Sequence, residues 1–374
     1  MKIAQITWWR GNYGSILQAY AMQKLLEQHN DVDVEILDQF GNSVSANGLL
    51  YRLKVIGIKG VYKKLRWKFF SKDLRKRNYA QDKFVKANLR ISPQQYDSYN
   101  INTANQYYDA FICGSDQIWN PNLSSLEDIY WLNFVDKSKV KIAYAPSIGI
   151  TSVDKVQAEM IKRSLEGYQA ISCREHSGTK CINNILGQNL CQTVLDPTLA
   201  LGVGEWEKVI KEVKIEYKYI FTYMLRGTKQ QRQMIEEYAK KKGFKIVTLP
   251  YLDAEHIVKY DKKFGDIKLY DIDPAEFIGL IKGATCVFTD SFHCSVFSIM
   301  FHKEFFLFPK LGQMERLKDI QDRFELPDRI ITEDDTYETI NNKKKIDWKY
   351  VDRSLIKQQK QSRDFLYSAI SSID

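Results

Sequence analysis

The chain has 374 residues, of which 44% are apolar and 13% aromatic, so it can bury substantial cores, and we expect two domains. It holds no run approaching about 18 apolar residues and begins without a signal-peptide pattern, so we expect a cytoplasmic protein without a membrane span. The net charge of +9 is concentrated between Arg52 and Arg77, and because no zinc finger, RNP sequence or helix-turn-helix accompanies it, we expect no nucleic-acid binding.

The first elements along the chain form a predicted βαβ unit. Residues 2–7 are an apolar strand that ends in a glycine-containing turn at 11–14. Apolar residues then recur at helical spacing over 16–25, and 32–38 form a second strand. The connection between the two strands is long enough for parallel pairing.

A basic segment interrupts this pattern over about 41–106, and we interpret it as a helical insertion. Between Arg52 and Arg77 it holds eleven lysines and arginines but only one acid, Asp73. Apolar residues at helical spacing run through 58–69. Two interpretations stay open: a helix that contacts an anionic membrane surface, or a solvated helix packed on the first domain.

Strands and helices alternate again beyond the basic segment, which indicates α/β domains with parallel sheets. In the first half we predict strands at 108–113, 140–145, 170–173 and 192–195, and helices at 153–166 and from 175. In the second half we predict strands at 219–225, 245–249, 285–289 and 304–308, and helices at 229–242, 274–283, 294–301 and 314–324. The chain thus divides into domains at 1–200 and 201–374. An amphipathic stretch at 355–370 predicts a terminal helix that docks on a domain, the first being one candidate.

The six cysteines show no spacing typical of metal ligands. They are Cys113, Cys173, Cys181, Cys191, Cys286 and Cys294. We therefore predict no metal site and no cofactor, and we expect reduced, mostly buried thiols.

In parallel α/β domains ligands gather beyond the carboxyl ends of the strands, and four segments occupy such positions. The first is the turn Gly11, Asn12, Tyr13 and Gly14, which opens a helix whose free N–H groups attract anions such as phosphate. A tight turn that needs glycine only for its backbone conformation is the alternative.

The second segment follows the strand at 108–113 and holds a carboxylate, two amides and an indole. Its candidate binding residues are Ser115, Asp116, Gln117, Trp119 and Asn120. This mixture suits a sugar, whose hydroxyls need donors and acceptors and whose apolar face stacks on an aromatic ring. Helix capping by Ser115 or Asp116 is the alternative.

The third segment places Arg174 at the end of a strand. There its guanidinium is positioned for a bidentate contact to a carboxylate or phosphate. An ion pair with Glu175 at the surface is the alternative.

The fourth segment, 289–294, follows the clearest strand of the second half and leads into a helix. It contains His293 together with Asp290 and Ser291. An imidazole has an ordinary pKa of about 6.5, so it can move protons near neutrality. His293 is therefore the candidate catalytic residue, although an isolated histidine is more often structural. Asp290 either orients the imidazole or caps the following helix.

Seven motifs follow one another in order along the chain. They are Gly11-Asn12-Tyr13-Gly14-Ser15, Gly114-Ser115-Asp116-Gln117-Ile118-Trp119-Asn120-Pro121, Tyr144-Ala145-Pro146-Ser147-Ile148-Gly149, Arg174-Glu175, Leu195-Asp196-Pro197-Thr198, Asp290-Ser291-Phe292-His293 and Glu315-Arg316. Together they resemble the polysaccharide pyruvyl transferase family over most of the chain.

The resemblance implies two Rossmann-like domains facing across a cleft, as in GT-B glycosyltransferases, with the acceptor on the first domain and the donor on the second. It implies transfer of pyruvate from phosphoenolpyruvate to hydroxyls of a cell-surface or exopolysaccharide glycan as a ketal. Arg174, Arg316 and Ser291 would bind the donor, and His293 would exchange protons with the substrate. The glycine turn and the segment at 115–120 would bind the acceptor or an anion. A lipid-linked acceptor would meet the basic segment at the inner face of the plasma membrane.

The chain departs from the family pattern at one position. Characterised ketal-forming members resemble Ser-Arg-Leu-His where this chain has Asp290-Ser291-Phe292-His293, so the donor-contacting arginine is missing from the stretch. Two alternatives therefore stay open. One is a GT-B glycosyltransferase that uses a nucleotide sugar, and the other is a non-catalytic glycan-binding relative.

Overall fold

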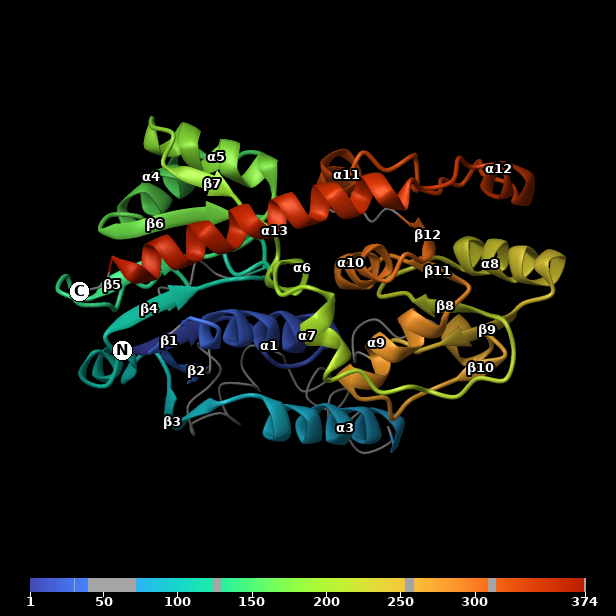
Figure 1. Ribbon diagram of the computed structural model, residues 1–374, viewed down its shortest axis with the longest axis horizontal. Coiled ribbons are helices and arrows are strands. Elements are labelled where there is room, and N and C mark those ends of the chain that lie inside the picture. Colours follow the sequence, from blue (N-terminus) through green and yellow to red (C-terminus); the bar gives the residue numbers. More distant parts are fainter. Residues whose placement is uncertain (30, 40–71, 124–128, 253–258, 309–313, 373–374) are drawn as a thin grey trace, which may run out of the picture.

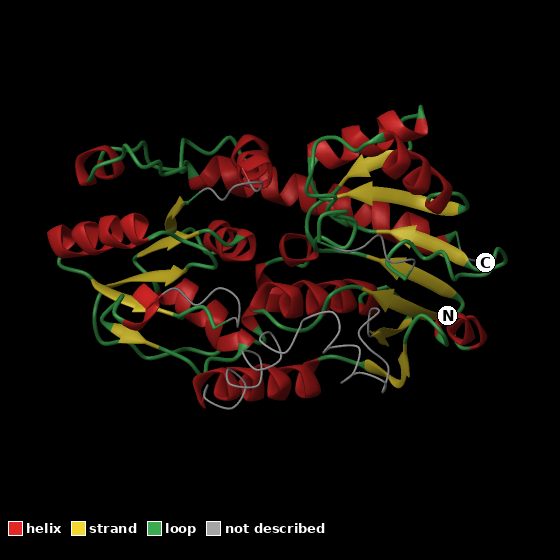
Figure 2. Cartoon of the chain, turned by 180° about the vertical axis from the view of Figure 1, so that it is seen from behind, coloured by secondary structure: helices red, strands yellow, loops and turns green. Residues whose placement is uncertain are grey.

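The computed structural model describes residues 1–29, 31–39, 72–123, 129–252, 259–308 and 314–372. Strands and helices alternate along the chain and build two parallel sheets, each covered by helices (Figures 1 and 2). The predicted α/β class with two Rossmann-like domains is confirmed. The helix expected within 58–69 and most of the basic segment lie outside the described residues.

The first domain is built on a sheet of seven strands. These are β1 (Lys2–Ile6), β2 (Asp33–Gln39), β3 (Ile91–Tyr96), β4 (Ala110–Cys113), β5 (Val140–Ala143), β6 (Tyr168–Cys173) and β7 (Cys191–Thr193). Their order is β3-β2-β1-β4-β5-β6-β7, and every pair is parallel. The helices of this domain are α1 (Tyr13–Glu27), α3 (Lys72–Asn88), the short 3₁₀ helix η1 (Ile101–Gln106), α4 (Lys155–Ser164) and α5 (His176–Leu186).

The second domain is built on five parallel strands. These are β8 (Tyr219–Tyr223), β9 (Lys245–Thr248), β10 (Ile267–Lys268), β11 (Cys286–Thr289) and β12 (Glu304–Leu307), in the order β10-β9-β8-β11-β12. The helices are α8 (Lys229–Lys242), η2 (Lys259–Lys262), α9 (Pro274–Gly283), α10 (Phe292–Met300), α11 (Met314–Arg323) and α12 (Tyr337–Asn341). Between the two domains run α6 (Pro197–Ala200) and α7 (Val203–Glu207), and the chain ends in α13 (Trp348–Ser371).

The basic segment is not wholly an insertion, because its last part completes the first sheet. Strand β3 pairs with β2 in parallel and forms the edge of the sheet, and α3 precedes β3 along the chain. The sequence of β3, Ile-Ser-Pro-Gln-Gln-Tyr, has little apolar alternation and contains Pro93, which an edge strand tolerates. For this reason the apolar pattern gave no indication of a strand here.

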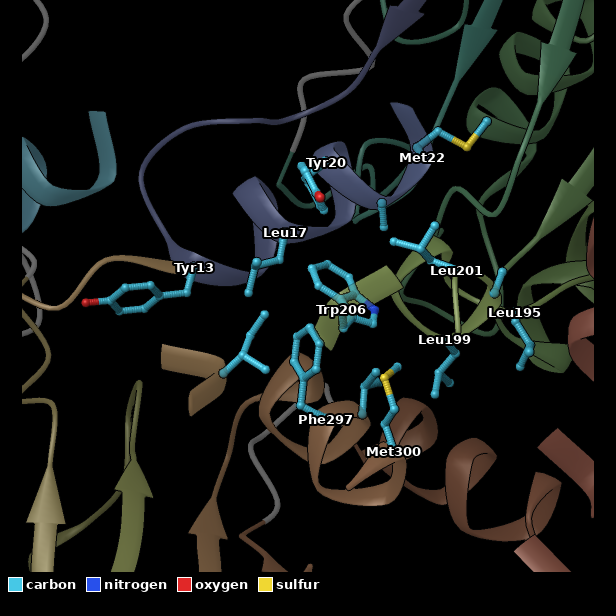
Figure 3. Packing of buried hydrophobic residues seen from close by; sticks show 14 of the residues in the cluster. Tyr13, Leu17, Tyr20, Met22, Leu195, Leu199, Leu201, Trp206, Phe297 and Met300 are labelled. Carbon is cyan, nitrogen blue, oxygen red and sulfur yellow. The ribbon is translucent and has the colours of Figure 1, made fainter. Parts of the chain in front are cut away.

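An apolar core joins the two domains. Figure 3 shows Trp206 of α7 between Tyr20 of α1 and Phe297 of α10. The ring centres lie 5.5 Å apart for Tyr20 and Trp206, and 5.0 Å apart for Trp206 and Phe297. The Trp206 indole N–H donates to the carbonyl of Thr198, so this large buried ring leaves no polar atom unsatisfied. The contact fixes α1 of one domain against α10 of the other.

Helix α13 crosses from the second domain to the first (Figure 1). Near the middle of the helix, Gln358 donates to the carbonyl of Arg323 at 3.3 Å. The next residue, Gln359, donates to the carbonyl of Leu199 at 2.7 Å, and the Ser362 hydroxyl accepts from the N–H of Leu195 at 2.8 Å. The helix therefore braces both domains.

Two expectations about composition can be compared with the structure. All six cysteines are buried, as expected, and all six are free thiols in this structure. None of the helices in the described part of the chain is both long and apolar enough to cross a bilayer.

Candidate active site between the domains

His293 lies in the first turn of α10, directly after the buried strand β11. Its side chain is only 7% exposed and faces the first domain, where its Nε2 lies 3.7 Å from Oδ2 of Asp196. This distance is longer than a hydrogen bond but short enough for a charge interaction. Within the described residues Nε2 has no hydrogen-bond partner, so it is available to a ligand.

Asp196 is the carboxylate that the sequence reasoning missed. It caps α6, because its Oδ1 accepts from the N–H and the hydroxyl of Thr198, and its Oδ2 accepts from Arg174 at 3.1 Å. Burial alone would raise the pKa of Asp196, but His293, Arg174 and Thr198 together hold that pKa well below its usual range. Asp196 is therefore an ionised carboxylate. Its Asp-Pro-Thr context is typical of a helix N-cap. Capping alone explains an aspartate at this position, so the sequence does not indicate its approach to His293.

Arg174 belongs to the same buried network. Its Nε lies 3.0 Å from Glu175 and its Nη1 3.1 Å from Asp196, so the pair with Glu175 exists but is buried rather than at the surface. Burial would lower the pKa of Arg174, but Glu175 and Asp196 raise it above its usual value. The guanidinium carbon lies 4.2 Å from the ring centre of Phe292. Arg174 is positively charged, and it already forms ion pairs with two carboxylates.

Gly14 lets the first domain approach the imidazole closely. A Cβ atom at this position would lie 2.2 Å from Nδ1 of His293, well inside contact distance. The neighbouring Asn12 caps α1 by accepting from the N–H of Ser15 at 2.9 Å, and Tyr13 donates its hydroxyl to the carbonyl of Ile272 in the second domain. Tyr13 and Gly14 of the glycine turn are therefore part of the domain contact, whereas Gly11, at a φ of +88°, is exposed and has open space around it.

The segment at 115–120 supports the site from inside the first domain. The Ser115 hydroxyl lies 2.9 Å from Oδ2 of Asp196, and Asp116 accepts from the Ser15 hydroxyl at 2.7 Å. Gln117 accepts from Asn120 at 3.0 Å. These contacts hold the loops that carry Asp196 and Gly14.

Trp119 does not fill the role predicted for it. The indole is fully buried and stacks on Trp131, with ring centres 4.5 Å apart. It therefore belongs to the core of the first domain and offers no face to a sugar in this structure. A tryptophan after a strand fits either role, and sequence does not show the partner ring.

Asp290 holds the loop that follows β8 through two hydrogen bonds to its carboxylate. Its carboxylate accepts from the N–H of Leu225 at 2.6 Å and of Arg226 at 2.8 Å, in the loop that follows β8. The carboxylate of Asp196, from the first domain, lies 3.7 Å from Nε2 of His293. Ser291 is buried at the N-cap of α10 but makes no side-chain cap. Residue 316 falls in α11, and the Arg316 side chain lies outside the described part of the structure.

A small pocket of about 10 Å³ lies beside this network, between the domains. It is lined by Arg174, Glu175, Asp196, Leu199, Phe292, Asp319, Ile320, Arg323 and Phe324. Arg323 donates to the carbonyls of Arg174 and Val194, and burial lowers its pKa. Among the described residues, Arg174 Nη2, Glu175 Oε2 and Arg323 Nε have no hydrogen-bond partner. Such buried polar atoms are typical of a place that receives a polar ligand or water.

The fold is similar to that of solved UDP-N-acetylglucosamine 2-epimerases. A putative enzyme from Listeria monocytogenes is 9% identical, with a TM-score of 0.59 and coverage of 99% of this chain and 96% of that chain. The enzyme from Rickettsia bellii is 9% identical, with a TM-score of 0.59 and coverage of 100% and 97%. The enzyme from Methanocaldococcus jannaschii, solved in complex with UDP-GlcNAc and UDP, is 13% identical, with a TM-score of 0.53 and coverage of 99% of each chain. At these identities the likeness shows a GT-B-like fold alone.

The sequence itself gives a more specific relationship. No curated protein matches it significantly. The family model described as "Polysaccharide pyruvyl transferase" matches residues 12–309, which include Gly14, Asp196 and His293. The chain therefore belongs to the polysaccharide pyruvyl transferase family.

Proposed function

We propose that this protein transfers pyruvate from phosphoenolpyruvate to two hydroxyls of a glycan and forms a pyruvyl ketal. The observation that carries the proposal is the meeting of His293 with Asp196 and Gly14 at the contact between the domains. An imidazole with a free Nε2 next to an ionised carboxylate is suited to taking a proton from a hydroxyl and passing it on. The family relationship supports a glycan as the acceptor.

The reaction needs two proton transfers that such a group can serve. Two oxygens of the acceptor form bonds to C2 of the enol, and the bond from C2 to the phosphate oxygen breaks. Of the two hydroxyl protons released, one is taken up at C3, which becomes a methyl group, and the other leaves with inorganic phosphate. His293 would relay these protons, while Asp196 stabilises the imidazolium that forms in between.

The donor carries a carboxylate and a phosphate, so its site must offer cations. Arg174 Nη2 and Arg323 Nε are unused donors in the pocket beside Asp196, and both belong to guanidinium groups. Arg316 and Ser291 are further proposed donor ligands. The first domain, which carries the segment at 115–120, would present the acceptor.

The test is direct detection of the product. The full chain is incubated with phosphoenolpyruvate and a panel of sugars, and mass spectrometry looks for a pyruvate adduct together with phosphate release. Replacing the proton relay, His293→Ala, should lower turnover by about 10²–10⁴-fold. The matched control is His302→Ala, which removes an exposed imidazole bound to Asp352 and should leave turnover unchanged. Near-full activity of the His293→Ala protein would contradict the assignment.

The melting temperature of the same protein distinguishes pyruvyl transfer from the two alternatives, a nucleotide-sugar glycosyltransferase and a glycan-binding protein. A ligand that binds only the folded state raises the melting temperature. We expect phosphoenolpyruvate to do so and nucleotide sugars not to. Stabilisation by a nucleotide sugar alone would favour a glycosyltransferase, and stabilisation by a glycan without any adduct would favour a binding protein.

A further inference from the structure

Arg77 is a buried cation that reaches from the first domain to the second. It lies in α3, is 5% exposed, and its Nη1 donates to the carbonyl of Pro250 at 2.7 Å. Its Nε and Nη2 have no hydrogen-bond partner, and it takes part in no ion pair with any described residue. A guanidinium in this state is costly, because its charge has lost water without gaining an anion from the described part of the chain.

The nearby carboxylates do not compensate for this charge. Six carboxylates act on the tyrosines that Arg77 also acts on: Asp73 and Asp261 on Tyr270, Asp271, Asp273 and Glu276 on Tyr13, and Asp290 on Tyr223. None of these six forms an ion pair with Arg77. Four of them are bound elsewhere: Asp261 to Arg232 at 2.6 Å, Asp273 to Lys211, Glu276 to the N–H of Asp273, and Asp290 to the N–H groups of Leu225 and Arg226. The free N–H groups of Arg77 therefore remain available.

Arg77 lies at the carboxyl edge of the second sheet. Pro250 follows β9 by two residues, and Tyr223, whose pKa Arg77 lowers against the effect of burial, ends β8. These points mark the carboxyl edge of the second sheet, where parallel α/β domains bind their ligands. Figure 1 shows α3 beside α9 of the second domain, so this side chain is delivered to the edge from the opposite domain.

The free groups also have the geometry of an anion fork. The N–H of Nε and one N–H of Nη2 lie on the same side of a guanidinium and point in parallel, so together they match two oxygens of one oxyanion. Tyr13, whose ring centre lies 5.9 Å from the Arg77 guanidinium carbon, is followed directly by Gly14, which contacts His293. The fork is thus linked through one residue to the turn that contacts the imidazole.

We propose that Arg77 binds a phosphoryl oxyanion at the carboxyl edge of the second sheet. The inference rests on the proposed function in one respect, because there the oxyanion is the phosphate of the donor or of the released product.

Anion binding by the full chain tests the proposal. Isothermal titration calorimetry measures the affinities for inorganic phosphate and for phosphoenolpyruvate in wild type, Arg77→Met and Arg77→Lys. Arg77→Met keeps the apolar stem but removes the fork, and we expect an affinity loss of about 10–100-fold for both anions. Arg77→Lys should lose less, because it keeps the charge. The matched control, Lys76→Gln, removes one exposed charge from the same helix and should bind as wild type does.

The melting temperature without ligand distinguishes a binding role of Arg77 from a structural one. The melting temperature of Arg77→Met should equal or exceed that of wild type, because an uncompensated buried charge has been removed. Wild-type affinity in Arg77→Met would overturn the proposal, as would a wild type that binds neither anion. If Arg77→Met does not fold, an Arg77→Lys protein with unchanged affinity overturns it equally.

The outcomes also separate this proposal from the proposed function. Phosphate binding that depends on Arg77, in a protein that transfers no pyruvate, keeps the anion site and rejects the transferase. Pyruvyl transfer together with unchanged anion affinity in Arg77→Met keeps the transferase and rejects the anion site.

Discussion

At the scale of single residues, the contact between Gly14 and His293 is the most sensitive point of the candidate site. The Gly14→Ala substitution would place a Cβ 2.2 Å from Nδ1, so the imidazole must move. A displacement of about 1 Å at a reacting group can cost about 10²-fold in rate, and we expect a turnover loss of that order. Overpacking should lower the free energy of unfolding by about 1–3 kcal/mol, which urea denaturation measures.

The chain offers a matched control for this substitution. Gly204 in α7 has open space where a Cβ would be added. Gly204→Ala should therefore leave turnover unchanged and alter the free energy of unfolding by about 1 kcal/mol or less, in the stabilising direction. If Gly14→Ala behaves like Gly204→Ala, the close approach has no role in holding the imidazole.

The sequence indicates which residues belong near the site but not which of them touch. His293, Gly14 and Arg174 follow strands, so their common edge is predictable from the alternation of strands and helices. The approach of Asp196 to His293 is not predictable in this way, because the two residues lie in different domains and only the docking of the domains brings them together. Trp119 shows the same limit, since its burial depends on Trp131.

At the scale of elements, two helices with strong capping signals in the sequence begin and end where the sequence predicts. The predicted ends of α8 and α9 agree with the structure, because both helices begin with a capping box and α9 also has Pro274 in its first turn. Strand β10 and helix α12 are short, so their few residues carry no periodic pattern. Strand β3 was missed because only its pairing with β2 makes it a strand.

Helix α13 is the element whose removal should affect both domains. Leu366 on this helix is fully buried in the core that joins the domains, and Leu366→Ala should lower the free energy of unfolding by about 2–5 kcal/mol. Ile356 on the same helix is 65% exposed, and Ile356→Ala should change the free energy of unfolding by less than about 0.5 kcal/mol. Urea denaturation followed by circular dichroism measures both. Equal effects would show that α13 does not depend on its buried face.

At the scale of the whole molecule, the two domains meet closely. The pocket between them has about 10 Å³, which is room for about one water molecule. Phosphoenolpyruvate is much larger, so binding there requires the domains to move relative to one another. Such a movement must keep Asp196 close to His293, because the proposed proton relay depends on that approach.

The buried charges at this contact make stability depend on pH. The pKa of Asp196 lies well below its usual range in the folded protein, whereas an unfolded aspartate titrates near about 3.9. A carboxylate with a depressed folded pKa stabilises the fold above the unfolded value, and this stabilisation is lost as the pH falls toward the folded value. The melting temperature of wild type should therefore fall steeply below about pH 4–5.

Replacing the carboxylate should remove this component of the pH dependence. Asp196→Asn leaves Arg174 with Glu175 as its remaining ion pair, and we expect a loss of about 3–5 kcal/mol near neutrality. The loss should shrink as the pH is lowered, because wild type then also loses the charge of Asp196. The control Asp364→Asn removes an exposed carboxylate paired with Lys360 and should change stability by about 0.5 kcal/mol or less. If the difference in melting temperature between wild type and Asp196→Asn stays constant from pH 7 to pH 3, the charge of Asp196 does not stabilise the contact between the domains.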